Sequence, residues 1–143
     1  VDGDVEGRVY WRLLPGVVLA HAVRGLLTGT LRREEDLPQA YWKELGGEGS
    51  VRGVDRNSVQ ATGGGRGGLV LRNEIRLSRG DVGIVAFWDR AGVWRRVSNA
   101  TWDGMTSGFG GGLRYNFGIP LRLDGGWGRG RGPEIYVSIG QAF

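Results

Sequence analysis

The stretch GLRYNFGIPLRLDGGWG (residues 112–128) decides the fold, because apolar and polar side chains alternate along it. Leu113, Tyr115 and Phe117 share one parity, and Arg114 takes the other. Successive side chains of a β-strand point to opposite faces, so the alternation indicates strands with one apolar face and one polar face.

The same alternation recurs along the chain and predicts seven strands. They are expected near residues 4–13, 16–27, 67–78, 81–94, 107–118, 119–127 and 133–143. Most connections are short turns such as Pro15-Gly16, which is typical of antiparallel hairpins. The connection at about residues 28–66 is far longer, and a loop of that length is usually functional. We therefore predict one all-β, antiparallel domain over residues 1–143.

Composition excludes several classes of protein. The chain has no cysteine and a single histidine, His21, so thiol chemistry is excluded and neither a cofactor nor a metal site is expected. No apolar run approaches the roughly 20 residues of a transmembrane helix, whereas strands of a membrane β-barrel need only about 9–11 alternating residues. An enzyme is not expected, because the paired carboxylates Glu34 and Glu35 lie in a charged run typical of a solvated loop.

The two parities suit the two sides of a transmembrane β-barrel. The polar parity carries Arg8, Arg12, Arg72, Arg76, Arg114, Arg122, Glu6, Glu74, Asp89 and Asp124. The apolar parity carries Trp11, Trp88, Tyr115, Phe117, Trp127 and Phe143. Charges of both signs suit a hydrated barrel interior, and aromatic residues suit girdles at the membrane interfaces. A soluble antiparallel β-protein is compatible with the same pattern.

Two glycine-rich stretches lie in or beside the long loop. GGEGSVRGVDRN (residues 46–57) is not a phosphate-binding loop, because no Gly-Lys-Ser/Thr follows and no helix begins after the glycines. GGGRGG (residues 63–68) has the composition of an RNA-binding patch, but it is one repeat long and leads directly into a strand. No nucleic-acid partner is expected. The arginine of the first stretch is instead available for contacts within the fold.

Four stretches occur in a specific order: GGEGSVRG, LRNEIRL, VAFWDRAGVW, and GGGLRYNFGIPLRLDGGWG with a final strand ending in Phe143. In this order they resemble the C-terminal half of the barrel in bacterial surface antigen proteins, the outer-membrane assembly superfamily that contains BamA and TamA. The resemblance covers about residues 37–143. Val54 stands where the family has an aromatic residue, and Ala91 where it has a glycine.

The resemblance implies the C-terminal part of a sixteen-stranded transmembrane barrel in the outer membrane of a Gram-negative type envelope. The family's transport repeats and first nine strands have no counterpart in these residues. It further implies a non-enzymatic role in inserting, assembling or translocating outer-membrane β-barrel proteins, with membrane lipids and unfolded outer-membrane proteins as partners. A passive outer-membrane barrel, or a soluble antiparallel β-protein with a binding role only, is the alternative.

The resemblance also implies that the long loop folds back into the barrel. Arg52, followed by Gly53, is then expected to pair with Glu74 and Asp89, and we call these four residues the latch. The loop motif further comprises Gly46, Gly47 and Val51. An arginine between two carboxylates can form charge-assisted, bidentate hydrogen bonds. The alternative is a solvated Arg52 that contributes less than about 1 kcal/mol.

The final strand resembles the C-terminal signal that the outer-membrane assembly machinery reads. Its residues of interest are Ile135, Val137, Ile139, Gly140 and Phe143. In the family this strand also meets the first strand at a weak seam, where an incoming strand can pair with the exposed edge. An ordinary lipid-facing strand is the alternative.

Seven strands cannot close into an antiparallel barrel, because the first and the last run in the same direction. An eighth strand in QAYWKEL (residues 39–45), a second copy of the chain, or the remainder of a longer barrel would complete the structure, since open strand edges are costly in lipid. We favour the remainder of a longer barrel.

Overall fold

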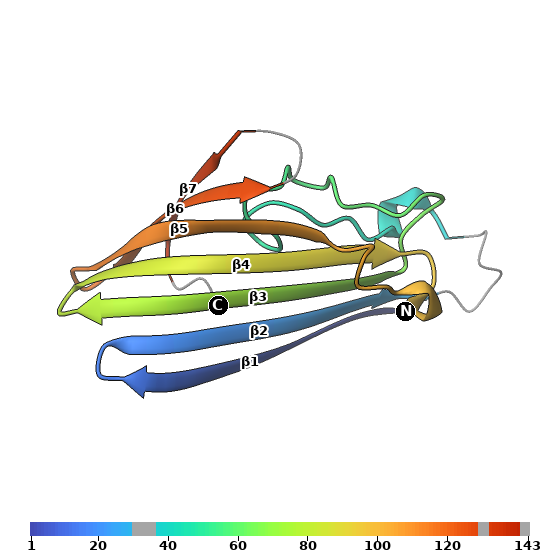
Figure 1. Ribbon diagram of the computed structural model, residues 1–143. Helices are drawn as coiled ribbons and strands as arrows, with labels where there is room; N and C mark the ends of the chain where they lie inside the picture. Colours follow the sequence, from blue (N-terminus) through green and yellow to red (C-terminus); the bar gives the residue numbers. More distant parts are fainter. Residues whose placement is uncertain (30–36, 129–131, 141–143) are drawn as a thin grey trace.

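The chain folds as one seven-stranded antiparallel sheet with the strands in sequence order (Figure 1). The computed structural model describes residues 1–29, 37–128 and 132–140. The strands are β1 (Asp2–Leu14), β2 (Val17–Thr28), β3 (Gly67–Arg79), β4 (Val82–Trp94), β5 (Thr106–Asn116), β6 (Pro120–Gly128) and β7 (Glu134–Ile139). These are the seven strands expected from alternation, with ends that differ by a few residues.

The strands expected at 107–118 and 119–127 are both present, and the turn between them moves their facing ends by one to two residues, because Asn116 pairs with Pro120 and Gly118 adopts a positive φ of 93°. One alternative for closing the sheet was wrong, because QAYWKEL supplies no eighth strand. Gln39–Tyr41 forms a short 3-10 helix (η2), and Leu45 makes only an isolated bridge to Val59.

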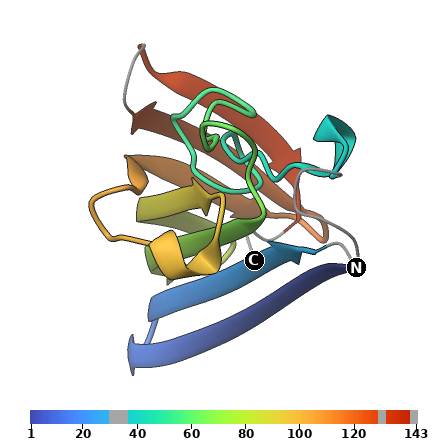
Figure 2. The same cartoon turned by 90° about the vertical axis from the view of Figure 1, so that its right-hand side faces the viewer.

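The sheet has an inner face, on which residues 37–66 pack, and an outer face. Figure 2 views the sheet along its strands, with residues 37–66 lying across it. The segment at residues 95–105 folds over the opposite side, where Met105 and the ring of Trp94 lie against Gly92. A second 3-10 helix, η3 (Val97–Asn99), lies within that segment. Loops therefore cover both sides of one end of the sheet.

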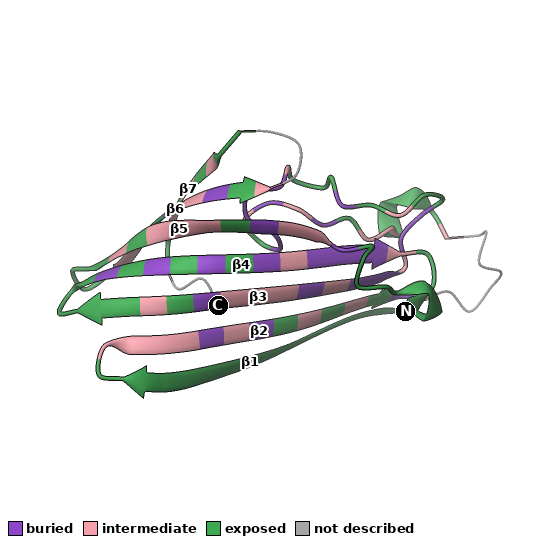
Figure 3. Ribbon diagram, in the orientation of Figure 1, coloured by how far each residue is buried: buried purple, intermediate pink, exposed green. Residues whose placement is uncertain are grey.

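Burial in the sheet is the reverse of that in a water-soluble protein. Along β4, Val85, Phe87 and Asp89 are buried on the inner face, whereas Ile84 and Trp88 of the outer face are exposed. Figure 3 shows burial concentrated in β4 and its neighbours, and β1 exposed along its length. The outer face is thus apolar and uncovered over most of its area.

Residues 37–66 contribute most of the small apolar core. The core consists of Leu45, Val51, Val54 and Val59 of the loop with Val70, Ala91 and Val93 of the sheet. Its members are mainly β-branched and lie near the end of the sheet at which β3 begins and β4 ends. The described part of the chain contains no helix long and apolar enough to cross a membrane.

Both edges of the sheet are open. Within the described residues, β1 pairs only with β2, and β7 pairs only with β6. The sheet is therefore a curved wall rather than a closed barrel.

Candidate functional site

The loop at residues 37–66 reaches the sheet as a pair of irregular, facing segments. Lys43 donates a backbone hydrogen bond to Gly65 (2.8 Å), and Leu45 and Val59 exchange two more. A tight turn follows, in which the Gly47 N–H binds the Val54 carbonyl (2.7 Å). The turn carries Arg52 to the inner face of the sheet.

Glycine makes this turn possible. Gly46 and Gly47 have φ angles of 120° and 83°, in the left-handed region that residues with a Cβ rarely adopt. The Gly46 N–H also donates to Ser50 Oγ (2.6 Å). These contacts give a structural reason for the glycines of the loop motif, while Val51 is fully buried in the apolar core.

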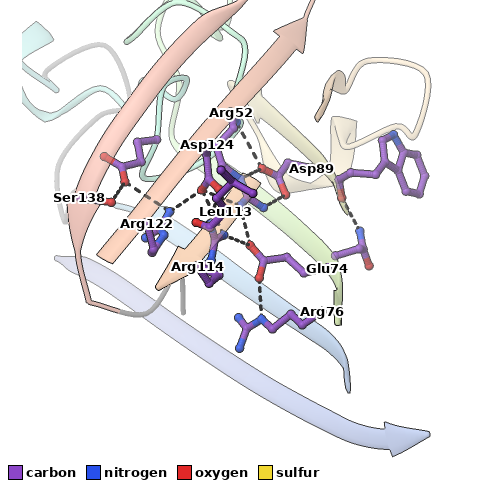
Figure 4. Close-up of polar contacts among 12 residues, drawn as sticks. Arg52, Glu74, Arg76, Asp89, Leu113, Arg114, Arg122, Asp124 and Ser138 are labelled. Carbon is purple, nitrogen blue, oxygen red and sulfur yellow. Dashed lines mark hydrogen bonds and ion pairs between the residues drawn. The ribbon is translucent and has the colours of Figure 1, made fainter. Parts of the chain in front are cut away.

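The guanidinium of Arg52 is fully buried and lies among three carboxylates (Figure 4). Nε and Nη2 donate to the two oxygens of Asp89 at 2.7 and 2.9 Å, which is a bidentate pair. Nη1 donates to Glu74 Oε1 at 2.5 Å and lies 3.4 Å from Asp124 Oδ2. The structure thus brings Arg52, Glu74 and Asp89 together, and it adds Asp124.

The strand register places the acids around one point. Asp89 faces Arg72 of β3, Glu74 faces Phe87 of β4, and both pairs lie on the inner face. The ring of Phe87 lies 3.7 Å from Arg52 Cζ, close enough for a cation–π interaction. The loop arginine therefore contacts carboxylates on three strands and an aromatic ring on β4.

A second set of arginines surrounds the acids from the sheet side. Arg76 donates to Glu74 Oε2 (2.7 Å), while Arg114 and Arg122 donate to Asp124 (2.5 and 2.9 Å). Glu74 and Asp124 therefore each bind guanidinium groups from at least two arginines. Because the acids are occupied in this way, the cluster is suited to holding the loop rather than to transferring protons.

Burial and the acids act on Arg52 in opposite senses. Burial by itself would lower the pKa of Arg52, but the hydrogen bonds and charge of Asp89, together with the charge of Glu74, outweigh it and raise the pKa above its ordinary value. The guanidinium remains charged, so the ion cluster is permanent under any condition in which the acids are ionised.

Gly53 lets the loop backbone approach the sheet backbone. It has a φ of 82°, and a Cβ in its place would collide with the backbone at Gly126 and Trp127. On the sheet side, a Cβ at Gly108 would overlap the carbonyl oxygen of Arg52, and one at Gly126 would lie 2.7 Å from the Gly53 nitrogen. Glycine is needed on both sides of this contact.

The loop is also held by β7. The Gly53 N–H donates to the hydroxyl of Tyr136 (2.9 Å), which in turn donates to Glu134. Farther along β7, Ser138 donates to Glu48 (2.7 Å). These contacts join residues far apart in the chain and lie on the face opposite to the apolar residues of β7.

The apolar residues of the final strand point outward. Ile135, Val137 and Ile139 are 73%, 71% and 73% exposed on the outer face. Gly140 has a φ of 112°, and its N–H donates to the carbonyl of Pro120 (2.8 Å), which ends the pairing of β6 and β7. Phe143, which the sequence analysis included in this strand, lies outside the described residues.

Several residues of the site were not among the sequence-based candidates. Asp124, Tyr136 and Phe87 all face the inner side. Asp124 has the polar parity of Arg122, and Tyr136 that of Glu134, so parity placed them on the correct face. Their contacts depend on where the loop crosses the sheet, which alternation does not encode. No group of three or more His, Cys, Asp or Glu side chains arranged to hold a metal ion occurs in the described residues.

Together, the fold and the site define an open antiparallel wall of the β-barrel type, held to an inserted loop by a buried ion cluster. The solved structure of BamA from Haemophilus ducreyi lacking POTRA domains 1–3 has this fold, with a TM-score of 0.67 and 16% sequence identity. The match covers 96% of this chain and 33% of that one, so the chain spans about a third of the BamA structure. No protein-family model and no curated protein matches the sequence.

The comparison confirms the expected fold class. The chain is all-β, with seven antiparallel strands in one open sheet that matches part of a BamA barrel. At 16% identity the two proteins share a fold, and the resemblance inferred from the sequence motifs is supported at that level.

Proposed function

We propose that the chain is part of the wall of an outer-membrane β-barrel that acts, without enzymatic chemistry, in the insertion, assembly or translocation of other outer-membrane proteins. The main observation in support of this proposal is that the polar face of the sheet is buried and the apolar face is exposed. The inner face buries Arg52, Glu74 and Asp89, while the outer face exposes large apolar side chains. A barrel in lipid has this distribution, with a polar lumen and an apolar exterior.

The outer face supports membrane residence by its extent. Its exposed apolar side chains include Val9, Trp11, Ile75, Leu77, Ile84, Trp88, Phe109, Leu113, Leu123, Trp127, Ile135, Val137 and Ile139. With Val23 and Leu27 of β2, which are also exposed, they come from all seven strands and form a continuous sheet surface. Monomeric soluble proteins rarely leave contiguous apolar patches of this size in water, so a bilayer or a large protein partner must cover them.

The inner face supports the assignment of residues 37–66 as a loop inserted in the lumen. In this proposal the latch (Arg52, Gly53, Glu74 and Asp89) fixes the loop to the wall and sets the shape of the lumen. Removing one partner from a buried ion pair leaves an uncompensated charge, so such a cluster strongly disfavours any arrangement in which the loop leaves the wall.

The open edges require further strands. Unpaired backbone groups at the edges of β1 and β7 would be costly in hydrocarbon, and because the two strands run in the same direction they cannot pair with each other in antiparallel fashion. The remaining strands of a longer barrel, or a second copy of the chain, would close it. The edge of β7 is then also where an unfolded client could add a strand, with Ile135, Val137 and Ile139 as the assembly signal.

Refolding into vesicles tests the proposal. The urea-unfolded 143-residue chain is diluted into phosphatidylcholine vesicles, and protection from added protease reports insertion. An unfolded outer-membrane β-barrel protein is then added, and its folding rate is compared with that in empty vesicles. We expect protection and faster client folding.

The other outcomes separate the alternatives. Insertion without faster client folding would indicate a passive barrel. A chain that is folded and monomeric in buffer without lipid or detergent would be a soluble β-protein, and the membrane proposal would be wrong.

A further inference from the structure

The outer face is almost free of charge. Alternate residues of all seven strands form it, and within the described strands its only charged members are Arg79 and Arg90. Arg79 is the last residue of β3, beside a turn, where water is close. Arg90 lies within β4, four residues before its end, and therefore needs a different explanation.

Two tryptophans enclose the Arg90 side chain. Its Cζ lies 4.1 Å from the centre of the Trp102 ring and 5.9 Å from that of Trp88. Its Nη2 donates to the Trp102 carbonyl (2.9 Å), which fixes the guanidinium against the segment at residues 95–105. Trp102 and Trp88 themselves remain about half exposed (55% and 46%). We call these three residues the Arg90 site.

The positive charge of this site lacks a counter-ion in the described residues. The inner-face residues Arg76, Arg114 and Arg122 each bind a carboxylate. Arg90, in contrast, makes only the contacts to the two tryptophans, and its buried Nε has no hydrogen-bond partner there. A half-buried charge without an acid is costly, so an anion from outside the chain would stabilise it.

We propose that the Arg90 site binds the phosphate of an anionic lipid in the surrounding bilayer. The inference rests on the proposed membrane location of the outer face. Tryptophan is enriched at the level of the headgroups, where its ring lies among the acyl chains and its N–H reaches water. A guanidinium is weakly hydrated and matches phosphate with two parallel donors, and cationic side chains near the bilayer surface attract anionic lipids.

The position of the site fits this ligand. Arg90 lies toward the end of the sheet at which residues 37–66 and 95–105 fold, and β4 continues for four residues beyond it. The band of outer face between Arg90 and Arg79 holds no charged residue in the described strands. Arg90 therefore marks one boundary of the apolar band, where a lipid phosphate would meet it.

Titration with lipids in detergent tests the site. The full chain is folded in a neutral detergent and titrated with phosphatidic acid or phosphatidylcholine of the same acyl chains, and native mass spectrometry reports the lipid bound. We expect phosphatidic acid to bind roughly tenfold more tightly, as for one additional charge-assisted interaction. Arg90→Gln should abolish this difference, and Trp102→Leu, which keeps the charge, should reduce it.

Arg56→Gln is the matched control, because Arg56 is an exposed arginine of the loop on the other side of the sheet. It removes the same charge and should leave the preference intact. Loss of the preference in Arg56→Gln as well would show that net charge, and not the Arg90 site, selects the lipid. If inorganic phosphate at equal concentration displaced phosphatidic acid, the site would recognise phosphate alone, and the proposal of a lipid ligand would be wrong.

The outcomes separate this site from the proposed function. A chain that inserts into phosphatidylcholine vesicles but binds the two lipids equally refutes the site and leaves the membrane proposal standing. A chain that does not insert and is folded and monomeric in buffer without lipid or detergent refutes the membrane proposal and the lipid site with it.

Discussion

The inner and outer faces of the sheet are made from alternate residues of the same strands, yet they hold opposite chemistry. On the inner face Arg52, Glu74 and Asp89 are at most 1% exposed, whereas Ile135 on the outer face is 73% exposed. A water-soluble protein typically buries its apolar side chains and exposes its charged ones. The difference shows that polar contacts hold the loop to the sheet, while the outer face leaves large apolar side chains exposed.

Removing Arg52 should destabilise the inner face more than any other change considered below. Arg52→Ala leaves Asp89 and Glu74 buried without their guanidinium, so we expect the free energy of unfolding in detergent to fall by roughly 3–5 kcal/mol. A urea titration followed by tryptophan fluorescence measures this. Arg56→Ala, in the same loop but exposed, should stay within about 0.5 kcal/mol of the parent.

The latch further predicts non-additivity. Because Arg52 and Asp89 stabilise each other, the double change Arg52→Ala with Asp89→Ala should be little worse than either single change. Fully additive losses would show that the two residues act independently and would contradict the latch.

A charge placed in the middle of the apolar band tests the outer face. Ile75 lies on β3 midway between Arg79 and Leu71, the residue that pairs with Arg90. Ile75→Arg should destabilise the chain in vesicles by about 2–4 kcal/mol, the cost of a cation near the bilayer centre. Val82→Arg, at the start of β4 beside Arg79, should cost at most about 1 kcal/mol. Equal costs at the two positions would argue against a bilayer around this face.

Gly125 and Gly126 are neighbours on β6 but belong to opposite faces, so substitutions at these positions compare the two faces. A Cβ at Gly126 would meet the loop backbone at Gly53, whereas one at Gly125 has no neighbour closer than 3.9 Å. Gly126→Ala should therefore lower the free energy of unfolding by about 1–3 kcal/mol through overpacking, while Gly125→Ala should be close to neutral. Similar effects at both positions in a urea titration would mean that the loop does not pack closely on β6.

The fold could be predicted from the sequence because its signal is local. Alternation gave all seven strands, since period two is a property of each strand alone. The strand ends differ by a residue or two, because the alternation runs on to Phe117 and Ile119 whereas β5 ends at Asn116 and β6 begins at Pro120. The open sheet also followed from the direction of the strands without any structural information.

The site was less accessible to sequence reasoning because it depends on where one loop crosses the sheet. The pairing of Arg52 with Glu74 and Asp89 came from a family resemblance, not from spacing. Asp124 and Tyr136 had the correct parity but no feature that set them apart from other polar inner-face residues. The Arg90 site was missed because its significance lies in the absence of a nearby acid, which requires three-dimensional neighbours.

The smallest expected effect concerns the contact between the loop and β7. Tyr136→Phe removes the hydroxyl that accepts from the Gly53 N–H, so it should cost about 1 kcal/mol, the typical contribution of one hydrogen bond. Tyr115→Phe removes a hydroxyl from the outer face, where Tyr115 is half exposed, and should have almost no effect on unfolding in detergent. If the two changes were equally mild, the Tyr136 hydroxyl would contribute nothing to holding the loop, and Ser138, which donates to Glu48, would be the side chain by which β7 contacts it.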